Sequence, residues 1–344
     1  MLKENMKTNF NGLDLLKFLM ALVVVMIHVK PNEPSELLNL VFTPLIKVSV
    51  PLFFVISSFL FFLKLNSIPS KNLLGGGKNI THFISRSARL YLAWFIIDLF
   101  YVIARKPYIQ LGFPEGVLEF FKDLFLGSTF PGSWFISALV VAVTIIFFLS
   151  KIVHPIAIFL VSLLISAYTL YPELFPANTL WIHQWYELNI RPEMNLSFPY
   201  ALVWISMGQL IALFYDKIVK KTKILVPLSL GMIIFCYLLD VFANNLLVHL
   251  LIMYVATASF FIYFALIHLA DSPVYKQIRN YSILIFLFHF SIAGKKTLFL
   301  SFVGESLSMH WIYYLLVIGI SICFAQSVLY LEKKKYLSFL RYLH

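Results

Sequence analysis

Long apolar segments alternate with short polar connections along the whole chain. Ten segments are long and apolar enough for a membrane-spanning helix, which needs roughly 20 residues. They cover residues 13–30, 40–63, 86–104, 134–150, 155–171, 198–215, 224–243, 246–270, 282–299 and 310–331. Their apolar runs are continuous, not alternating, which disfavours a transmembrane barrel. The pattern predicts an all-α fold: a polytopic integral membrane helix bundle of about ten transmembrane helices, forming one domain over residues 1–344.

Composition excludes an ordinary soluble enzyme. The 344 residues are 60% hydrophobic and 12% charged, with a mean hydropathy of +0.86, whereas soluble domains are roughly one quarter charged. The first apolar run follows Lys3 and Lys7 and resembles a signal peptide. However, Asp14 and Lys17 lie inside it and no small-residue cleavage site precedes Pro31, so we expect a retained first helix.

The positive charge is concentrated in the short connections, and it sets the expected orientation. Nineteen of the 27 Lys and Arg residues fall in segments that share the side of the N-terminus, and 27 − 19 leaves eight. The eight are Lys30, Lys47, Arg105, Lys106, Lys122, Arg191, Lys295 and Lys296. Cytoplasmic connections carry the excess of basic residues, so both termini are expected in the cytoplasm. This placement also argues against nucleic acid as the partner behind the net charge of +11.

Three connecting segments carry further patterns. Apolar residues recur at helical spacing in Glu115–Leu126, which predicts a helix at the outer interface. The run from Gly75 to Lys78 lacks the spacing of a phosphate-binding loop and is predicted as a flexible cytoplasmic loop. The outer segment 172–195 is suited either to stacking on a sugar or to an ordinary aromatic belt. Its aromatic and polar residues are Trp181, His183, Trp185, Tyr186, Glu187 and Arg191.

The first span contains three ionisable residues, Asp14, Lys17 and His28. Such residues are costly in lipid, and each is a candidate for a functional site. At 100° per residue the three share one stripe, and Lys17 and His28 are separated by roughly 16 Å along the axis. In one interpretation, Lys17 and His28 contact different parts of one ligand. Alternatively, Asp14 and Lys17 form an interfacial pair and His28 caps the outer end.

Two other sites carry ionisable residues. Arg86 and Arg89 lie one turn apart at the predicted start of the third span. They either bind the phosphates of an anionic nucleotide or only set the topology. His289 has apolar neighbours in the ninth span, where a histidine often hydrogen-bonds a neighbouring helix. No HExxH, CxxC or GxSxG motif occurs, and the nine histidines are too scattered to suggest a metal site.

An ordered set of short motifs resembles the acyltransferase 3 family of integral-membrane acyltransferases. The family's first motif is a basic residue followed, after ten intervening residues, by a functional histidine. Lys17 and His28 match this motif, although Lys17 takes a position that is usually arginine. PLFFVISSFLFF (residues 51–62) is similar to a Pro-x-Phe-Phe-x-x-Ser-Gly-Phe element, with Ser58 in place of glycine. Three further elements complete the set. They are an Arg-x-x-Arg pair (Arg86-Ser-Ala-Arg89), a Trp-Phe pair at the start of a span (Trp134-Phe135) and a late span that ends near a histidine (His289). The match is closer to short, stand-alone members.

The resemblance implies transfer of an acyl group, commonly acetyl, from cytoplasmic acyl-CoA to a hydroxyl of a glycan or lipid-linked saccharide. His28 becomes the catalytic candidate, as general base or transient acyl carrier, and His289 is the second catalytic candidate, which orients the acceptor or stabilises the oxyanion. Lys17, Arg86 and Arg89 become the contacts to the CoA donor, and the other candidates are Asp14, Ser57 and Trp134. No metal is implied, and a bacterial cytoplasmic membrane is the expected location.

Two rival functions fit a chain with many spans. A transporter or flippase for a polar or lipid-linked solute lines its pathway with intramembrane charges. A membrane scaffold without chemistry leaves the charges of the first span unexplained. The ordered motif set and the lack of a detectable repeat relating two halves favour the enzyme.

Overall fold

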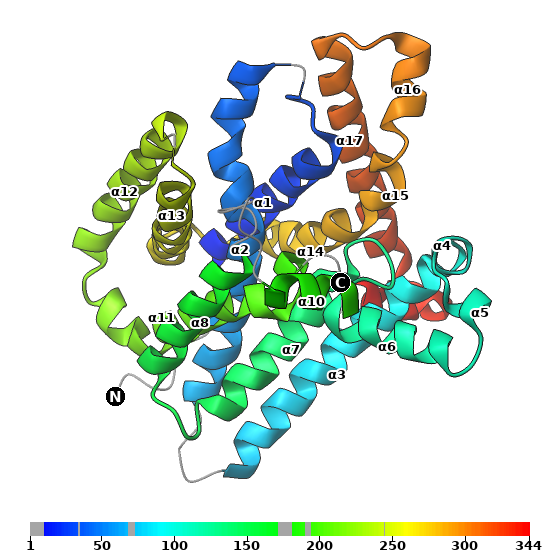
Figure 1. Cartoon of the computed structure of the whole chain (residues 1–344). Coiled ribbons are helices and arrows are strands. Elements are labelled where there is room, and N and C mark those ends of the chain that lie inside the picture. Colours follow the sequence, from blue (N-terminus) through cyan, green and yellow to red (C-terminus); the bar gives the residue numbers. More distant parts are fainter. Residues whose placement is uncertain (1–9, 34, 68–72, 171–180, 190–193, 244) are drawn as a thin grey trace. The chain divides into compact units, whose positions relative to one another are not determined.

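The computed structural model describes residues 10–33, 35–67, 73–170, 181–189, 194–243 and 245–344. Every regular element in these residues is a helix, and they contain no strand (Figure 1). The predicted all-α class is therefore confirmed.

Ten of the helices match the apolar segments. They are α1 (Asn11–Val29), α2 (Glu36–Asn66), α3 (Leu73–Ile97), α7 (Ser133–Leu149), α8 (Pro155–Thr169), α11 (Phe198–Val219), α12 (Thr222–Phe242), α13 (Leu246–Leu266), α14 (Pro273–Phe288) and α17 (Leu307–Leu331). The shorter elements are α4 (Leu99–Arg105), α5 (Tyr108–Leu111), α6 (Glu115–Leu126), α10 (Trp181–Asn189), α15 (Phe290–Ala293), α16 (Lys296–Val303) and the 3₁₀ segments η1 (Met194–Leu196) and η2 (Lys335–Leu343).

Several of the helices are long and apolar enough to cross a membrane. In the described part of the chain six meet both criteria, and two bent pairs raise the number to eight if each pair is one span. The remaining two apolar helices, α7 and α8, have 17 and 15 residues. The protein is thus a multi-pass membrane protein, while the count of about ten spans and the side of the termini stay predictions.

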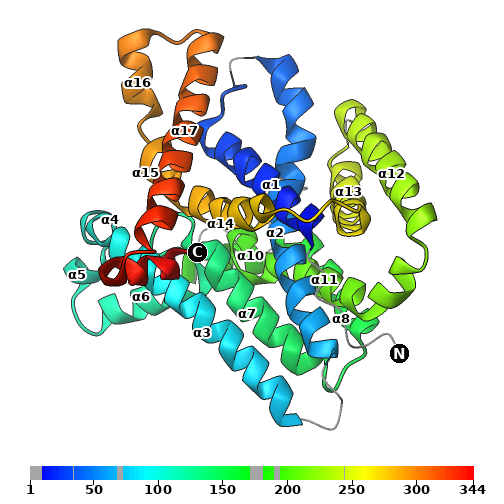
Figure 2. The same cartoon turned by 180° about the vertical axis from the view of Figure 1, so that it is seen from behind.

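The chain forms two compact units. Unit 1 comprises residues 1–53, 217–342 and 344, and unit 2 comprises residues 54–216 and 343. In unit 1, α1 packs against α14, α17 and α13, and α12 pairs with α13 (Figures 1 and 2). In unit 2, α7 contacts α3 and α6, and α5 packs on α6.

Capping residues explain where several helices begin. The Ser272 and Asn245 side chains accept hydrogen bonds from the backbone N–H groups of Val274 (3.3 Å) and Leu247 (2.8 Å) at the starts of α14 and α13. Pro273 occupies the first turn of α14, where its missing N–H costs nothing. The first residues of α13 and α14 are therefore determined by capping hydrogen bonds, as well as by the apolar length of each helix.

Two predicted spans have the wrong boundaries. The third was predicted over 86–104, but α3 begins at Leu73 and the chain bends by 67° before α4. Residues 75–78 thus lie in a helix and not in a loop. The ninth was predicted over 282–299, but α14 begins at Pro273, and the helix bends by 57° before α16. Hydropathy detects only the part of a helix that suits lipid, whereas backbone hydrogen bonding continues through polar residues.

The helix predicted over residues 115–126 is confirmed with the same bounds, as α6. Its Asp123 is 3% exposed and forms an ion pair with Lys106 (3.0 Å) and a hydrogen bond with the Tyr108 hydroxyl. Leu118 and Phe121, in contrast, are 60% and 48% exposed. This helix thus turns its carboxylate inward and its apolar residues outward, and its location at the outer interface stays a prediction.

A glycine in unit 2 permits a close helix contact. A methyl group at Gly208 would overlap the Ser58 hydroxyl and lie 2.6 Å from the Val55 carbonyl oxygen. We expect Gly208→Ala to destabilise the protein by about 1–3 kcal/mol, because the backbone must shift to relieve the overlap. The measurement is the thermal-unfolding midpoint in detergent. Gly231→Ala is the control, since nothing lies within 4 Å of a methyl group there; equal midpoints for both variants would contradict the predicted overlap.

The orientation in the membrane is open to direct measurement. In a background where Cys236 and Cys323 are serine, we expect cysteine at Glu187 to react with a membrane-impermeant thiol reagent in intact cells. Cysteine at Lys221 is expected to react only after permeabilisation, because the charge bias predicts a cytoplasmic location for it. Both positions are exposed. The reverse pattern of labelling would show that the predicted orientation is inverted.

Candidate functional site

The two histidines singled out in the sequence lie together in unit 1. The ring centroids of His28, near the end of α1, and His289, between α14 and α15, are 5.1 Å apart. The ring of Phe290 lies 4.4 Å from that of His28 and 4.1 Å from that of His289. This proximity follows from helix direction: Asn11 at the start of α1 donates to Asp271 (3.0 Å) just before α14, so the two helices run in parallel.

The two imidazoles differ in their accessibility. His289 is fully buried, and its Nδ1 lies 3.0 Å from the Ile285 carbonyl oxygen. Donation from Nδ1 to that carbonyl leaves the lone pair on Nε2, which has no hydrogen-bond partner in the described residues. His28, in contrast, is exposed. The pair therefore offers one imidazole that a ligand reaches and, beside it, a buried acceptor atom.

The opposite end of α1 carries the other charged candidates. Asp14 is 9% exposed, and its carboxylate lies 3.6 Å from the Arg279 guanidinium of α14. Lys17, one turn further on, is half-buried. Asp14 and His28 are separated by about 21 Å along the helix axis. Arg279 was missed in the sequence, because only the packing of α14 on α1 brings it to Asp14.

The remaining candidates lie in unit 2. Arg86 and Arg89 are exposed in the middle of α3, and not at its start as predicted; the Arg89 Nε donates to the Ser85 carbonyl (3.3 Å). Ser57 is half-buried in α2, and the ring of Trp134 lies 6.2 Å from that of Phe54. Thus His28, His289, Asp14 and Lys17 belong to one unit, and Arg86, Arg89, Ser57 and Trp134 to the other.

The aromatic outer segment is described in part, as α10 and η1. His183 is 1% exposed, with its Nε2 2.7 Å from the Tyr168 carbonyl oxygen and its ring stacked on that of Tyr168. Trp181 and Trp185, one turn apart, are 74% and 50% exposed. Arg191 lies outside the described residues. The structure therefore leaves two exposed indoles, and both readings of this segment stay open.

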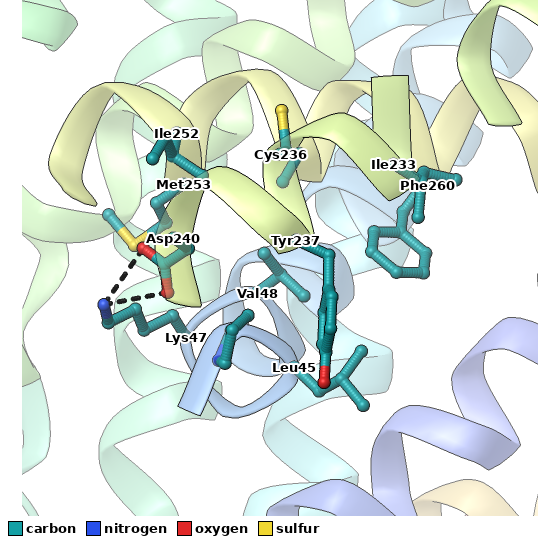
Figure 3. A pocket seen from close by; sticks show the side chains of 12 residues that line it. Leu45, Lys47, Val48, Ile233, Cys236, Tyr237, Asp240, Ile252, Met253 and Phe260 are labelled. Atoms are coloured by element: carbon teal, nitrogen blue, oxygen red, sulfur yellow. Dashed lines mark hydrogen bonds and ion pairs between the residues drawn. The ribbon is translucent and has the colours of Figure 1, made fainter. Parts of the chain in front are cut away.

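A second polar cluster in unit 1 was not recognised in the sequence. The Lys47 ammonium of α2 lies 3.2 and 3.1 Å from the two carboxylate oxygens of Asp240 (Figure 3). It also lies 3.0 Å from His249 Nδ1. His249 Nδ1 also contacts Asp240, which is 3% exposed. The adjoining cavity of about 10 Å³ has room for about one water molecule. This cluster joins α2 to α12 and α13. It stabilises their packing, because separation of the helices would leave the buried Asp240 carboxylate without a partner, which is costly.

The apolar helices define a multi-pass membrane protein, and the imidazole pair lies near one end of its α1. A family model described as an acyltransferase domain matches residues 10–330, and the chain belongs to this family, acyltransferase 3. Comparison with curated proteins and with solved structures found no match. The suspected family is thereby confirmed. The protein is a membrane acyltransferase, and nothing supports the transporter alternative.

Proposed function

We propose that the protein moves an acetyl group from cytoplasmic acetyl-CoA to a hydroxyl of a cell-surface glycan or a lipid-linked saccharide, in the cytoplasmic membrane of a bacterium. The observation that carries this proposal is the contact between His28 and His289 at one end of α1, in a chain of the acyltransferase family. An imidazole changes protonation near neutral pH, so it can take a proton from a hydroxyl.

Attack of the acceptor hydroxyl is the step that the imidazole pair assists. The hydroxyl oxygen bonds to the thioester carbonyl carbon while its proton passes to His28. The carbon–sulfur bond then breaks, and the CoA thiolate leaves and receives a proton, which gives an ester and free CoA. The alternative route, in which His28 carries the acyl group transiently, uses the same exposed imidazole and ends in the same products.

His289 is assigned the second catalytic role in this proposal. Its Nε2 carries a free lone pair beside His28. That atom accepts a hydrogen bond either from the protonated His28 or from the acceptor hydroxyl, and it thereby orients the reacting groups. Burial fixes the ring, and the bond from Nδ1 to the Ile285 carbonyl selects the tautomer that leaves Nε2 as an acceptor.

The donor contacts are proposed at the basic residues Lys17, Arg86 and Arg89. Guanidinium groups bind phosphate in a bidentate manner, whereas lysine supplies a point charge. Asp14, Ser57 and Trp134 are proposed to shape the donor site. For the saccharide, Trp181 and Trp185 offer exposed indole faces, on which sugar rings stack through their apolar C–H surfaces.

The test is a turnover assay with purified full-length protein in nanodiscs. Acetyl-CoA is supplied with a panel of bacterial glycans and lipid-linked saccharides, and free CoA and the acetylated product are both measured. We expect release of CoA to require one of the acceptors and to match the product in amount. Absence of transfer from acetyl-CoA to every acceptor, by protein that is folded and monodisperse, would contradict the proposed donor and acceptor pair.

A further inference from the structure

The last helical segment, η2 (Lys335–Leu343), is amphipathic with a period of three residues. In a 3₁₀ helix the side chains of residues three apart lie above one another, so the nine residues of η2 form three faces of three side chains each. One face consists only of leucine. Leu337 and Leu340 are half-buried, and Leu343 is 4% exposed. This leucine face is therefore the buried side of η2.

The two other faces of η2 are aromatic and basic. The exposed aromatic face consists of Tyr336 (90% exposed), Phe339 (57%) and Tyr342 (36%). The basic face consists of Lys335, Ser338 and Arg341, and both of its cations are exposed. In a chain that spans a membrane, exposed aromatic rings are typical of the boundary between lipid and water. Aromatic and basic faces that adjoin a buried apolar face are typical of a helix that lies on a membrane surface.

The end of the chain that contains η2 is strongly basic. Residues 331–344 contain one acidic residue, Glu332, and its Oε2 lies 2.7 Å from His344 Nε2. The same residues contain four exposed cations: Lys333, Lys334, Lys335 and Arg341. Within the described part of the chain these four take part in no ion pair. The segment therefore presents a positive charge that is available to an anionic surface.

η2 lies next to the end of a candidate span. Helix α17 ends at Leu331, and only three residues, 332–334, separate it from η2. An extended chain of this length reaches at most about 14 Å. The contact between Glu332 and His344 also brings the residue that follows η2 back to the end of α17. The segment is thus within reach of the lipid headgroups at which α17 ends, on the side that is predicted to face the cytoplasm.

We propose that η2 binds the anionic phospholipid headgroups of the leaflet at which α17 ends. Lys335 and Arg341 contact lipid phosphates, while Tyr336 and Phe339 lie at the boundary between the headgroups and the acyl chains. The cytoplasmic leaflet has a negative surface potential, which attracts basic segments beside a span, and a guanidinium group suits phosphate. Positive charge alone would only set the orientation of α17, and it would not account for the exposed aromatic face. The assignment does not depend on the identity of the acyl donor or acceptor.

The experiment uses the full-length protein in phosphatidylcholine nanodiscs, with Cys236 and Cys323 replaced by serine. A fluorophore is attached to cysteine at Ser338, which lies between Lys335 and Arg341 on the basic face. Phospholipid with a spin label near the top of its acyl chain is added as phosphatidylglycerol or as phosphatidylcholine, and quenching is measured against its mole fraction. We expect half-maximal quenching at a lower mole fraction of phosphatidylglycerol, because the basic face concentrates this lipid beside the fluorophore.

The variants remove one face at a time. Lys335→Gln and Arg341→Gln are each expected to raise the mole fraction of phosphatidylglycerol at half-maximal quenching about fivefold, the effect of one basic residue near an anionic surface. Quenching by phosphatidylcholine should not change. Combined replacement of Tyr336 and Phe339 by serine should weaken quenching by both lipids, because η2 loses the rings that hold it at the depth of the spin label. The matched controls, expected to behave like wild type, are the exposed lysines near the connection between α11 and α12, as Lys220→Gln and Lys223→Gln.

Three results would overturn the assignment to anionic lipid. The first is equal quenching by the two lipids in wild type, or a preference for phosphatidylglycerol that survives both Lys335→Gln and Arg341→Gln. The second is loss of the preference on addition of inorganic phosphate at constant ionic strength, which would make the basic face a general anion site. The third is quenching by both lipids that is present in nanodiscs with one copy of the chain and absent in nanodiscs with two, which would make η2 an interface between copies.

Discussion

Replacement of His28 by alanine is expected to lower the rate of acyl transfer by roughly 10²- to 10⁴-fold, the usual contribution of general acid–base catalysis. The affinity for acetyl-CoA is expected to stay near that of wild type. The reason is distance: His28 lies about 16 Å along α1 from Lys17, far from the proposed phosphate contacts. Binding and turnover should therefore separate. The measurement is the transfer rate and the CoA dissociation constant of the same purified, monodisperse sample.

His268→Ala is the matched control, because that histidine is exposed and follows the end of α13. We expect it to retain the wild-type rate. If His28 only joins helices, its loss should cost about 1 kcal/mol of bundle stability, and the folded fraction should stay active. Near-normal transfer by folded His28→Ala protein would remove the central residue of the proposed mechanism.

Arg86→Ala or Arg89→Ala is expected to weaken acyl-CoA binding by roughly ten- to a hundredfold. A charge-assisted hydrogen bond to phosphate contributes roughly 1.5–3 kcal/mol, and the affinity for the acceptor should change little. Lysine at either position keeps the charge without the bidentate geometry, so it should restore only part of the affinity. Titration of CoA against the purified variants measures the effect.

The control for the arginines is Arg105→Ala at the end of α4, which lies outside the Arg-x-x-Arg motif. Unchanged CoA affinity in both Arg86→Ala and Arg89→Ala, together with altered orientation in the membrane, would return these residues to a topological role.

The helical class and most spans were predictable because lipid leaves few options for the backbone. A segment in hydrocarbon must satisfy its own hydrogen bonds, so continuous apolar runs form helices. The same reasoning failed at the ends of α3 and α14, where polar residues continue the helix beyond the apolar part. The glycine run at residues 75–78 also predicts a loop, although these residues lie inside α3.

The candidate residues were predictable from the energetic cost of ionisable groups in lipid, whereas their partners were not predictable. Asp14, Lys17, His28 and His289 were recognisable because ionisable groups in apolar segments are expensive. Periodicity also placed the first three on one stripe of a single helix. However, a helical pattern relates residues only within its own segment. It gives no information about which other helix faces the stripe.

Packing between distant segments decided the rest. The contact of His28 with His289, the pairing of Asp14 with Arg279 and the cluster at Lys47 all join helices far apart in the chain. These contacts arise because α14 runs parallel to α1 and because α12 and α13 pack as a pair. The sequence by itself determined the helices and the residues that lipid tolerates poorly. Only the tertiary structure decided which of those residues meet, because interhelical contacts depend on the direction and rotation of each helix, which hydropathy does not record.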